Sequence, residues 1–328
     1  MRINNKNFCG KAGSEIMKKI YLGLGGIGGQ IIEQLADVID DSNTEFINID
    51  VERELKKQNN KTRFIDFRTP ASVIDILNVC PEMRKWMPRS PLLKDCVSCN
   101  DRILGRLYFE RYLKQYNILE TLGFENIEGD IEVNIVSTSF GNTGSGILLH
   151  LLLLMHKFFI ETNMNYDINL FIILPEFIET LIPSKIEKKI NMVKTYAFLR
   201  EIYALNKIFA GEDNLERIEL DGFIDYKIIQ QSKKKLYKHI CFSCGGKNSN
   251  NYIEKNNYLV DAICKYNSFG DFSMFDINET TSSNLILDAS KNYRTEYDEY
   301  VSSVKQESNL HITPHIDKQW HEILPAIE

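Results

Sequence analysis

Two glycine-rich stretches contain the residues in this chain that are best suited to bind a phosphate. The first reads YLGLGGIGGQIIEQL at positions 21–35, and the second reads SFGNTGSGILLHLL at positions 139–152. Each places several glycines directly before an apolar run. Glycine lets backbone N–H groups approach a phosphate closely, and the N-terminus of a helix carries a partial positive charge. We therefore expect each stretch to turn from a strand into a helix beside an anion.

The first stretch, taken alone, fits a dinucleotide-binding turn. Residues 23–28 satisfy the pattern G-x-G-x-x-G, and Asp50 ends the next expected strand, where such folds keep an acid for the ribose. The same pattern also occurs in tight strand-to-helix crossovers that bind nothing. An NAD-binding oxidoreductase of the Rossmann type and an adenylating enzyme therefore stay open as interpretations of this loop.

The second stretch favours a polyphosphate. Both loops follow expected parallel strands, so they lie at the same carboxyl edge of the sheet, where ligands bind. A dinucleotide fold uses one glycine loop for one pyrophosphate, whereas two facing loops can hold a polyphosphate from two sides. Thr143 and Ser145 add hydroxyl donors, while neither loop contains a lysine and the P-loop pattern does not occur. Backbone dipoles are therefore expected to neutralise most of the phosphate charge.

Alternating strand and helix patterns are expected to position these loops. We predict strands at 18–24, 45–50, 62–67, 132–139, 168–175, 225–230 and 238–244, and helices at 29–39, 105–124, 144–160, 184–208 and 252–266. The alternation predicts an α/β fold with a Rossmann-like, mostly parallel sheet and helices on both faces. The apolar runs LFIIL and VNIV are typical of strands buried on both sides.

Three regions are expected along the chain. We predict a disordered lead-in at 1–17, a nucleotide-binding domain at 18–268, and a partial or reduced second domain at 269–328. The last region loses the strand–helix rhythm and is richer in Asn, Ser, Tyr and Glu.

Composition is that of a soluble globular protein. The chain has 328 residues, of which 43% are hydrophobic and 26% charged, and its formal net charge is −6, which argues against nucleic-acid binding. No signal peptide is recognised, and the apolar run at 147–160 is expected to be a buried helix that is too short to span a bilayer. We therefore predict a cytoplasmic protein without membrane insertion.

Cysteine and histidine clusters raise the question of a metal. Cys96/Cys99 and Cys241/Cys244 have zinc-ligand spacing, but residues 241 and 244 fall on an expected strand, where side chains three apart point to opposite faces. The stretch HITPHIDKQWH could bind a metal, or it could lie at the surface while its tryptophan docks on the main domain. Its ligand-type residues are His311, His315, Asp317 and His321. We predict no metal held by protein ligands alone.

The two loops together resemble the phosphate loops of the tubulin/FtsZ superfamily. The stretch GNTGSG is similar to the signature G-G-T-G-[ST]-G of that family, and GLGGIGGQ is similar to its first phosphate loop, in the form typical of bacterial tubulin-like proteins. The order of elements also agrees: loop, helix, strand ending in Asn or Asp, signature loop, helix, and strand ending in proline. The resemblance covers about residues 18–267 and implies a GTPase-type domain.

The resemblance implies which residues contact the phosphates. The first loop would present its backbone to the α- and β-phosphates, and the second would cradle the β- and γ-phosphates. Asn48 and Asp50 would lie near the γ-phosphate. The loop residues concerned are Gly25, Gly26, Gly28, Gly141, Asn142, Thr143, Gly144, Ser145 and Gly146.

The resemblance also implies contacts to the ribose and the base. Gln30 would reach toward the guanine or the ribose, and Glu176, after Pro175, would contact the ribose. Asn248 or Asn251 would read the guanine edge, unless KNSNN is only a surface turn and a helix N-cap.

The chain departs from the family pattern at two places. Asn142 stands where the signature usually has glycine; Asn tolerates a left-handed backbone, but its side chain would crowd the phosphates. The family's N-x-D-x-x-D loop, which completes the active site of the next subunit in a filament, is replaced here by FGDFSMFDINE. Its candidate catalytic acids are Asp271, Asp276 and Glu279.

These patterns predict a GTP- or GDP-binding protein of the tubulin/FtsZ type, with Mg²⁺ as an accompanying ion. We expect it to self-associate into filaments or to bind other proteins, and to hydrolyse GTP slowly or not at all. The alternatives are an NAD-binding oxidoreductase and a tubulin-fold scaffold that does not hydrolyse nucleotide.

Overall fold

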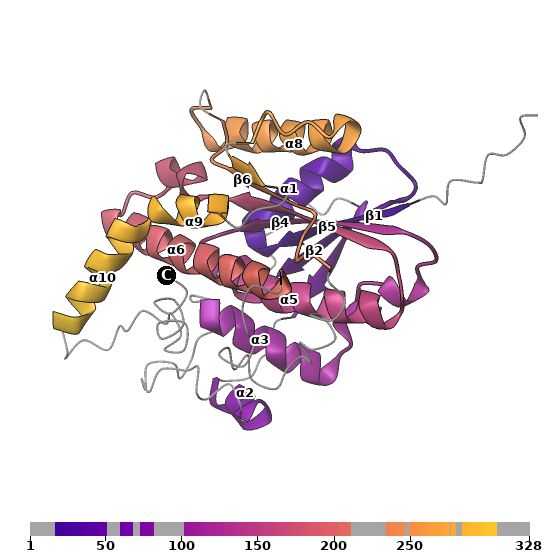
Figure 1. Cartoon of the computed structure of the whole chain (residues 1–328), viewed down its shortest axis with the longest axis horizontal. Helices are drawn as coiled ribbons and strands as arrows, with labels where there is room; N and C mark the ends of the chain where they lie inside the picture. Colours follow the sequence, from indigo (N-terminus) through magenta and orange to yellow (C-terminus); the bar gives the residue numbers. More distant parts are fainter. Residues whose placement is uncertain are drawn as a thin grey trace, which may run out of the picture.

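One mixed sheet organises the residues that the computed structural model describes, which are 17–50, 60–67, 73–81, 102–210, 234–246, 249–275, 277–279 and 284–306. Within them the strand order is β3-β2-β1-β4-β5-β6-β7. All neighbours pair in parallel except β7, which is antiparallel to β6 (Figure 1). The strands are β1 (Lys18–Leu24), β2 (Thr44–Asp50), β3 (Thr62–Asp66), β4 (Ile131–Thr138), β5 (Tyr166–Ile173), β6 (His239–Ser243) and β7 (Ile277–Glu279). The predicted α/β fold with a mostly parallel sheet is confirmed.

Helices cover both faces of the sheet. Helices α1 and α8 lie on one face, α3, α5 and α6 lie on the other, and α9 and α10 pack on α6 (Figure 1). The α-helices are α1 (Gly25–Val38), α2 (Val73–Val79), α3 (Arg102–Gln115), α4 (Ile118–Thr121), α5 (Asn142–Glu161), α6 (Lys185–Phe209), α8 (Tyr252–Phe269), α9 (Asn284–Lys291) and α10 (Arg294–Gln306). Short 3-10 helices are η3 (Phe124–Asn126), η4 (Pro175–Phe177) and η5 (Glu179–Leu181).

Several predictions fall outside the described residues. They concern the lead-in at 1–16, the strand at 225–230, Cys96, Cys99, Asn248, Asp276, and the stretch with His311, His315, Asp317 and His321. For Glu279 the backbone alone is described, as part of β7.

Two helices differ most from their predicted bounds. Helix α1 begins at Gly25 rather than at residue 29, so the glycines of the first loop form its first turns. Glycine has a low helix propensity, which hid this start from sequence reasoning. The helix predicted at 105–124 is divided, because Asn117 accepts hydrogen bonds from the N–H groups of Leu119 and Glu120 and so caps a new helix, α4.

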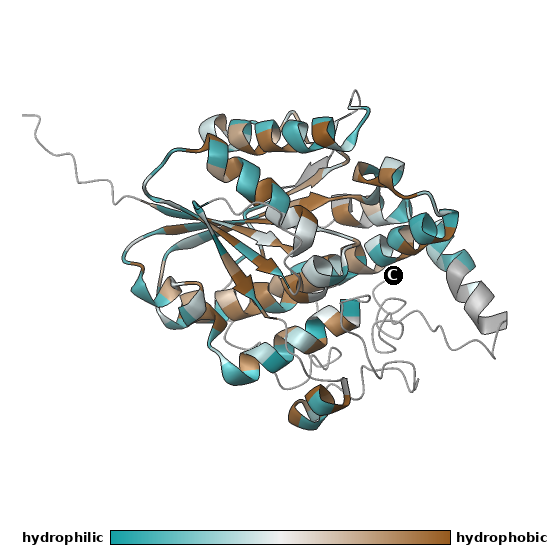
Figure 2. Ribbon diagram, turned by 180° about the vertical axis from the view of Figure 1, so that it is seen from behind, coloured by the Kyte–Doolittle hydropathy of each residue, from teal (hydrophilic) through white to brown (hydrophobic). Residues whose placement is uncertain are grey.

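The apolar character of helix α5 is explained by its position in the core. It packs on β1 and β4 and is covered by α3, and Figure 2 shows apolar residues concentrated in the strands and in this inner layer. The helix extends beyond the predicted apolar run at 147–160, and by length and composition alone its 20 residues would be enough to cross a membrane. Burial of 67% of its most apolar segment supports the prediction of a core helix.

His156 joins α5 to the strands beyond it. Its side chain is fully buried, with Nδ1 2.8 Å from the Tyr166 hydroxyl and Nε2 2.8 Å from the Leu236 carbonyl oxygen. A carbonyl only accepts, so Nε2 carries the proton and Nδ1 accepts from Tyr166. Burial lowers the pKa of His156 from 6.5 to about 4, so the ring is neutral near pH 7.

The described residues after α8 pack on the same sheet and core. Strand β7 extends the sheet beyond β6. The rings of Tyr297 in α10 and Tyr196 in α6 lie 4.5 Å apart, and Lys189 pairs with Glu299 at 2.6 Å. Ile286 of α9 joins the core on the α6 side. A partial or reduced second domain at 269–328 stays a prediction, since residues 307–328 lie outside the described part.

Candidate functional site

The two glycine loops meet at the point where the strand order of the sheet reverses. From β1 the chain proceeds through α1 to β2 on one side, and from β4 it proceeds through α5 to β5 on the other. Neighbouring strands β1 and β4 pair up to Leu24 and Ser137. Helices α1 and α5 lie on opposite faces, and sheets of this kind bind ligands in a crevice outside the carboxyl ends of such a pair of strands.

The loops touch each other through their glycines. Gly25 has a φ of 75°, a left-handed conformation that favours glycine. A Cβ built on Gly25 would lie 3.2 Å from the backbone nitrogen of Gly144, and one on Gly144 would lie 2.6 Å from the carbonyl oxygen of Leu24. The two expected phosphate loops are therefore in van der Waals contact.

The helices that start at these loops lack side-chain caps. Among the described residues, no side chain caps the N-terminus of α1 at Leu24 or of α5 at Gly141, and the first turn of each contains no acid. By contrast, side-chain oxygens of Asn117, Ser184 and Asn251 cap α4, α6 and α8. Two helix N-termini without side-chain caps thus lie next to each other at the carboxyl edge of the sheet.

Packing accounts for several of the glycines. A Cβ on Gly28 would lie 2.5 Å from the carbonyl oxygen of Val136, and one on Gly146 would lie 2.5 Å from that of Arg102. These residues, like Gly144, let α1 and α5 lie directly on protein backbone. Gly26 and Gly141 are partly exposed, so their backbone is among the parts of the loops that a ligand could reach.

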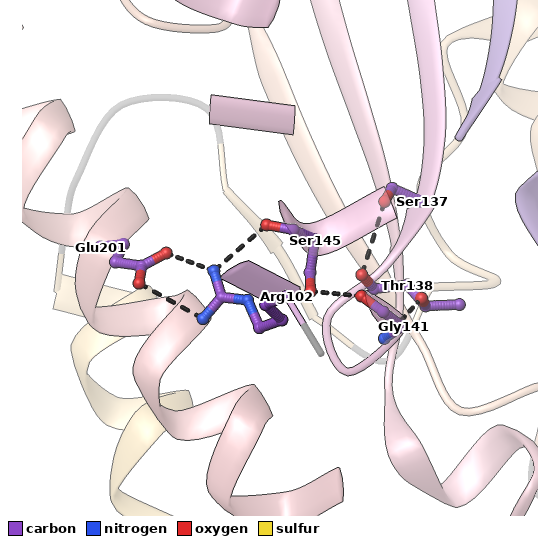
Figure 3. Close-up of polar contacts among 6 residues, drawn as sticks. All are labelled: Arg102, Ser137, Thr138, Gly141, Ser145 and Glu201. Carbon is purple, nitrogen blue, oxygen red and sulfur yellow. Dashed lines mark hydrogen bonds and ion pairs between the residues drawn. The ribbon is translucent and has the colours of Figure 1, made fainter. Parts of the chain in front are cut away.

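Hydroxyl groups shape the second loop from within. The Ser145 hydroxyl donates to the carbonyl oxygen of Gly141, and the N–H of Gly141 donates to the Thr138 hydroxyl at 2.9 Å (Figure 3). Ser145 is 1% exposed and Thr143 8% exposed. The Ser145 hydroxyl therefore holds the turn, and its predicted role as a donor to the phosphate is not supported by this geometry.

Sequence reasoning missed an arginine that fixes the second loop. Arg102, the first residue of α3, forms an ion pair with Glu201 of α6, and its guanidinium donates to the Ser145 carbonyl oxygen at 3.1 Å (Figure 3). Both charged side chains are at most 14% exposed. No local sequence pattern indicated this contact, because the partners lie 43 and 99 residues from Arg102.

A lysine also reaches this loop. Lys194 of α6 donates from Nζ to Oδ1 of Asn142 at 2.6 Å. At the next position, the Thr195 hydroxyl lies 2.9 Å from the Ser139 hydroxyl, which also donates to the Ile173 carbonyl oxygen at 3.2 Å. The loops contain no lysine of their own, and α6 supplies one.

Three further predicted site residues lie beside the first loop. Gln30 accepts a hydrogen bond from the Tyr252 hydroxyl at 2.7 Å, which ties α1 to α8. Asn48 is 1% exposed and fills the space next to the missing side chain of Gly29, and its Oδ1 has no hydrogen-bond partner among the described residues. Asp50 is buried at the carboxyl end of β2.

The residues expected to contact ribose and base already have protein partners. The Glu176 carboxylate accepts from the Tyr293 hydroxyl at 3.0 Å, and the Glu176 carbonyl oxygen accepts from Lys255 at 2.6 Å. Asn251 caps α8: its Oδ1 accepts from the N–H of Glu254 at 3.0 Å and its Nδ2 donates to the Glu254 carboxylate. In the described structure Asn251 is therefore the N-cap of α8, which was one of the two interpretations of KNSNN.

The described catalytic candidates lie far from the glycine loops. Helix α8 starts at the carboxyl edge, where Tyr252 bonds Gln30, and ends at the opposite edge, where Asn267 accepts from Lys19 at 2.7 Å. Its 18 residues span about 27 Å. Asp271 follows that end, and hydrogen bonds from Ser273 lower the pKa of its carboxyl. Glu279 is paired with Ile240, in the amino-terminal half of β6.

The cysteines behave as expected for a strand. Cys241 joins the core on the α8 side, whereas Cys244 packs against the core on the α5 side. Among the described residues, no group of three or more His, Cys, Asp or Glu side chains is arranged to hold a metal ion.

Fold and site together define a doubly wound α/β protein with two uncapped helix N-termini at its switch point. No family model matches the chain, and no curated protein matches it in sequence. Among solved structures it is similar to TubZ of Clostridium botulinum phage c-st, with 13% identity and a TM-score of 0.42 over 77% of this chain and 60% of that one.

Two other solved structures are similar to a comparable extent. CetZ from Methanosaeta thermophila has 14% identity and a TM-score of 0.43 over 84% of this chain and 59% of its own. A GTPγS-form protofilament of Bacillus thuringiensis TubZ has 15% identity and a TM-score of 0.41 over 76% of this chain and 54% of its own. The chain spans about three fifths of the length of the first solved proteins it matches. The likeness to these tubulin-family proteins concerns the fold alone.

Proposed function

We propose that the chain binds a guanine nucleotide, GTP or GDP, in the crevice between the carboxyl ends of β1 and β4. The main support is that the uncapped N-termini of α1 and α5 meet there. Each N-terminus is equivalent to about half a positive charge, so their contact is unfavourable unless an anion lies between them. A polyphosphate held from two sides meets this requirement, with the backbone N–H groups in the first turns of α1 and α5 as donors.

Ribose and base would be held by the loops after β5 and β6. Glu176 and Asn251 follow these strands, on the same edge as the glycine loops. Both have protein partners, so nucleotide binding would exchange the Tyr293 and Glu254 contacts for contacts to the ligand. Preference for guanine over adenine, through Asn248 or Asn251, is expected to be worth about 1–3 kcal/mol. Equal competition by ATP and GTP would contradict this assignment.

Identifying the bound nucleotide tests the proposal directly. Purified protein is denatured, and the released small molecules are separated and identified. Guanine nucleotide supports the proposal. If the protein is purified without a nucleotide, titration with GTP, GDP, ATP and NAD⁺ shows which of them it binds. Failure to bind any of the four would favour a scaffold.

An NAD-binding oxidoreductase is the second candidate, and one observation favours it. The order β3-β2-β1-β4-β5-β6 is the order of dinucleotide-binding folds, and Asp50 ends β2, where those folds bind the ribose. The second glycine loop is unexplained by that function, since one pyrophosphate needs one loop. Recovery of NAD from the denatured protein would support this candidate.

Self-association of the chain is supported by exposed apolar residues at both edges of the sheet. Exposed apolar residues lie near the carboxyl edge at Leu181, Ile186 and Ile253, and near the opposite edge at Val38 and Phe269. Unlike surfaces at opposite ends favour a head-to-tail contact, which produces open filaments. Sedimentation of the protein with and without GTP should show polymer. Ile253→Asp and Phe269→Asp should each abolish it, whereas Ile74→Asp, on the exposed face of α2, should not.

Hydrolysis would then need two copies of the chain. Within one copy, helix α8 separates Asp271 from the glycine loops by about 27 Å. A head-to-tail neighbour would bring Asp271, Asp276 or Glu279 to the nucleotide, where a carboxylate can orient the attacking water. We expect slow hydrolysis that depends on assembly.

A further inference from the structure

We infer that Lys194 is the phosphate-binding cation of this site, an assignment that rests on the proposed function and deepens it. Lys194 lies in α6, 52 residues after the signature loop. Its ammonium contacts Asn142, the first residue of α5, at the uncapped helix N-terminus. Lys194 thus provides the charged side chain that both loops lack.

The contact places a positive charge where a helix end is already positive. A carboxylate at position 142 would pair with Lys194 and also stabilise the start of α5. The side chain there is instead a neutral amide, which orients the ammonium by a hydrogen bond without cancelling its charge. An ammonium has three N–H donors, so its bond to Asn142 is compatible with a bond to a phosphate oxygen.

The position of α6 relative to the loop is fixed on both sides of Lys194. The neighbouring Thr195 hydroxyl bonds to the hydroxyl of Ser139, the first residue after β4. Two turns further along α6, Glu201 pairs with Arg102, which bonds to Ser145. These buried contacts leave Lys194 little freedom to move away from the loop, so the cation is positioned before the nucleotide arrives.

This geometry also gives Asn142 a role. As a departure from the family signature, Asn142 was expected to crowd the phosphates. Its side chain points instead to Lys194 and accepts a hydrogen bond from it. We assign Asn142 as the positioning residue of the lysine, which explains why a residue other than glycine is compatible with a phosphate loop here.

Binding of GTP and of guanosine to Lys194→Gln tests the assignment. Loss of a hydrogen bond to a charged phosphate should weaken GTP binding about 10- to 100-fold, while guanosine, which has no phosphate, should bind as it does to the wild type. GTP binding by the variant should also depend less on ionic strength. Lys194→Arg should retain most of the affinity, and Lys207→Gln, near the far end of α6, is the matched control.

The possible results separate this assignment from the proposed function. If the wild type binds GTP and the Lys194→Gln variant binds it equally well, the role of Lys194 is overturned but the proposed function is not. An equal loss for GTP and guanosine would also overturn it, because that result indicates a structural effect. Wild-type protein that binds no guanine nucleotide would overturn the proposed function and this assignment with it. Melting curves without nucleotide establish that each variant is folded.

Discussion

At the scale of single residues, position 142 is one where the residue that best stabilises the fold differs from the residue that best suits nucleotide binding. It begins α5 without an acid in the first turn, and it contacts Lys194. A helix start of this kind is less stable than one with a carboxylate, but its positive potential is available to a ligand. Residues that improve the helix should therefore damage the site.

The substitution Asn142→Asp should raise stability and lower affinity together. A carboxylate at the start of α5 should stabilise the fold by about 0.3–1 kcal/mol. The same charge beside the phosphates should weaken GTP binding about tenfold or more. Denaturant unfolding and nucleotide titration measure the two effects. Asn165→Asp, an exposed position before β5, controls for net charge. Parallel changes in stability and affinity would contradict the assignment.

His156 should make the protein sensitive to mild acid. Because its pKa is lowered to about 4 in the fold and is 6.5 when unfolded, the unfolded state takes up the proton first as pH falls. The stability provided by the neutral ring is complete above pH 6.5 and is lost toward pH 4, by roughly 3 kcal/mol at about 1.4 kcal/mol per pH unit.

Comparison with His156→Gln isolates this contribution. Glutamine can still donate to Leu236 and accept from Tyr166, but it does not titrate. The unfolding free energies of the wild type and the variant, measured between pH 7 and pH 4, should converge as pH falls. Parallel curves over this range would mean that His156 does not titrate as expected.

At the scale of elements, the glycines of α1 hold the helix close to the sheet. Gly28→Ala would improve helix propensity by about 1 kcal/mol, yet its Cβ would lie 2.5 Å from the Val136 carbonyl oxygen, which belongs to the backbone of β4. We expect a net loss of at least 2 kcal/mol. Gly129→Ala, at a left-handed turn with open space around it, should cost about 1 kcal/mol. Thermal unfolding measures the stability of both variants. A Gly28→Ala variant as stable as the wild type would contradict the close packing of α1 on β4.

The contact between Tyr293 and Glu176 should secure helices α9 and α10. Tyr293 is 5% exposed, and its hydroxyl donates to a carboxylate on the loop after β5. Tyr293→Phe should cost about 1–2 kcal/mol and increase hydrogen exchange in α9 and α10. Tyr116→Phe, at an exposed site after α3, serves as the control. Unchanged exchange in α9 and α10 would show that Tyr293 does not hold them.

The predictable elements are those with strong local signals. Strands β4 and β5 are nearly continuous apolar runs because both faces are buried, and Ser184 marks the start of α6 with a side-chain cap. The start of α1 at Gly25 was missed because tertiary packing overrides the low helix propensity of glycine. Arg102, Lys194 and Tyr293 were missed because each acts on a partner at least 43 residues away. The two loops were predictable as motifs, whereas the division of their glycines between packing and binding was not.

At the scale of the whole molecule, the separation of Asp271 from the glycine loops predicts complementation. Asp271→Asn retains intact loops, and Asn142→Asp retains an intact acid at the other end. Each variant alone should hydrolyse GTP poorly. In a mixed assembly, the loops of the first meet the acid of the second, so phosphate release should exceed the sum of the separate samples. Wild-type activity per molecule should also rise with protein concentration. Brisk turnover by dilute monomer would contradict a shared site.

The packing role of Gly28, Gly144 and Gly146 has a consequence for how such proteins diverge. A copy of this gene that no longer needed nucleotide would still need these glycines, because any side chain there would strike the backbone of β4, β1 or α3. Selection for folding alone would preserve the glycine pattern long after its ligand was lost. Lys194 and Asn142 have no such constraint and would drift first. In distant descendants, that pair is therefore a better record of nucleotide binding than the glycine signature.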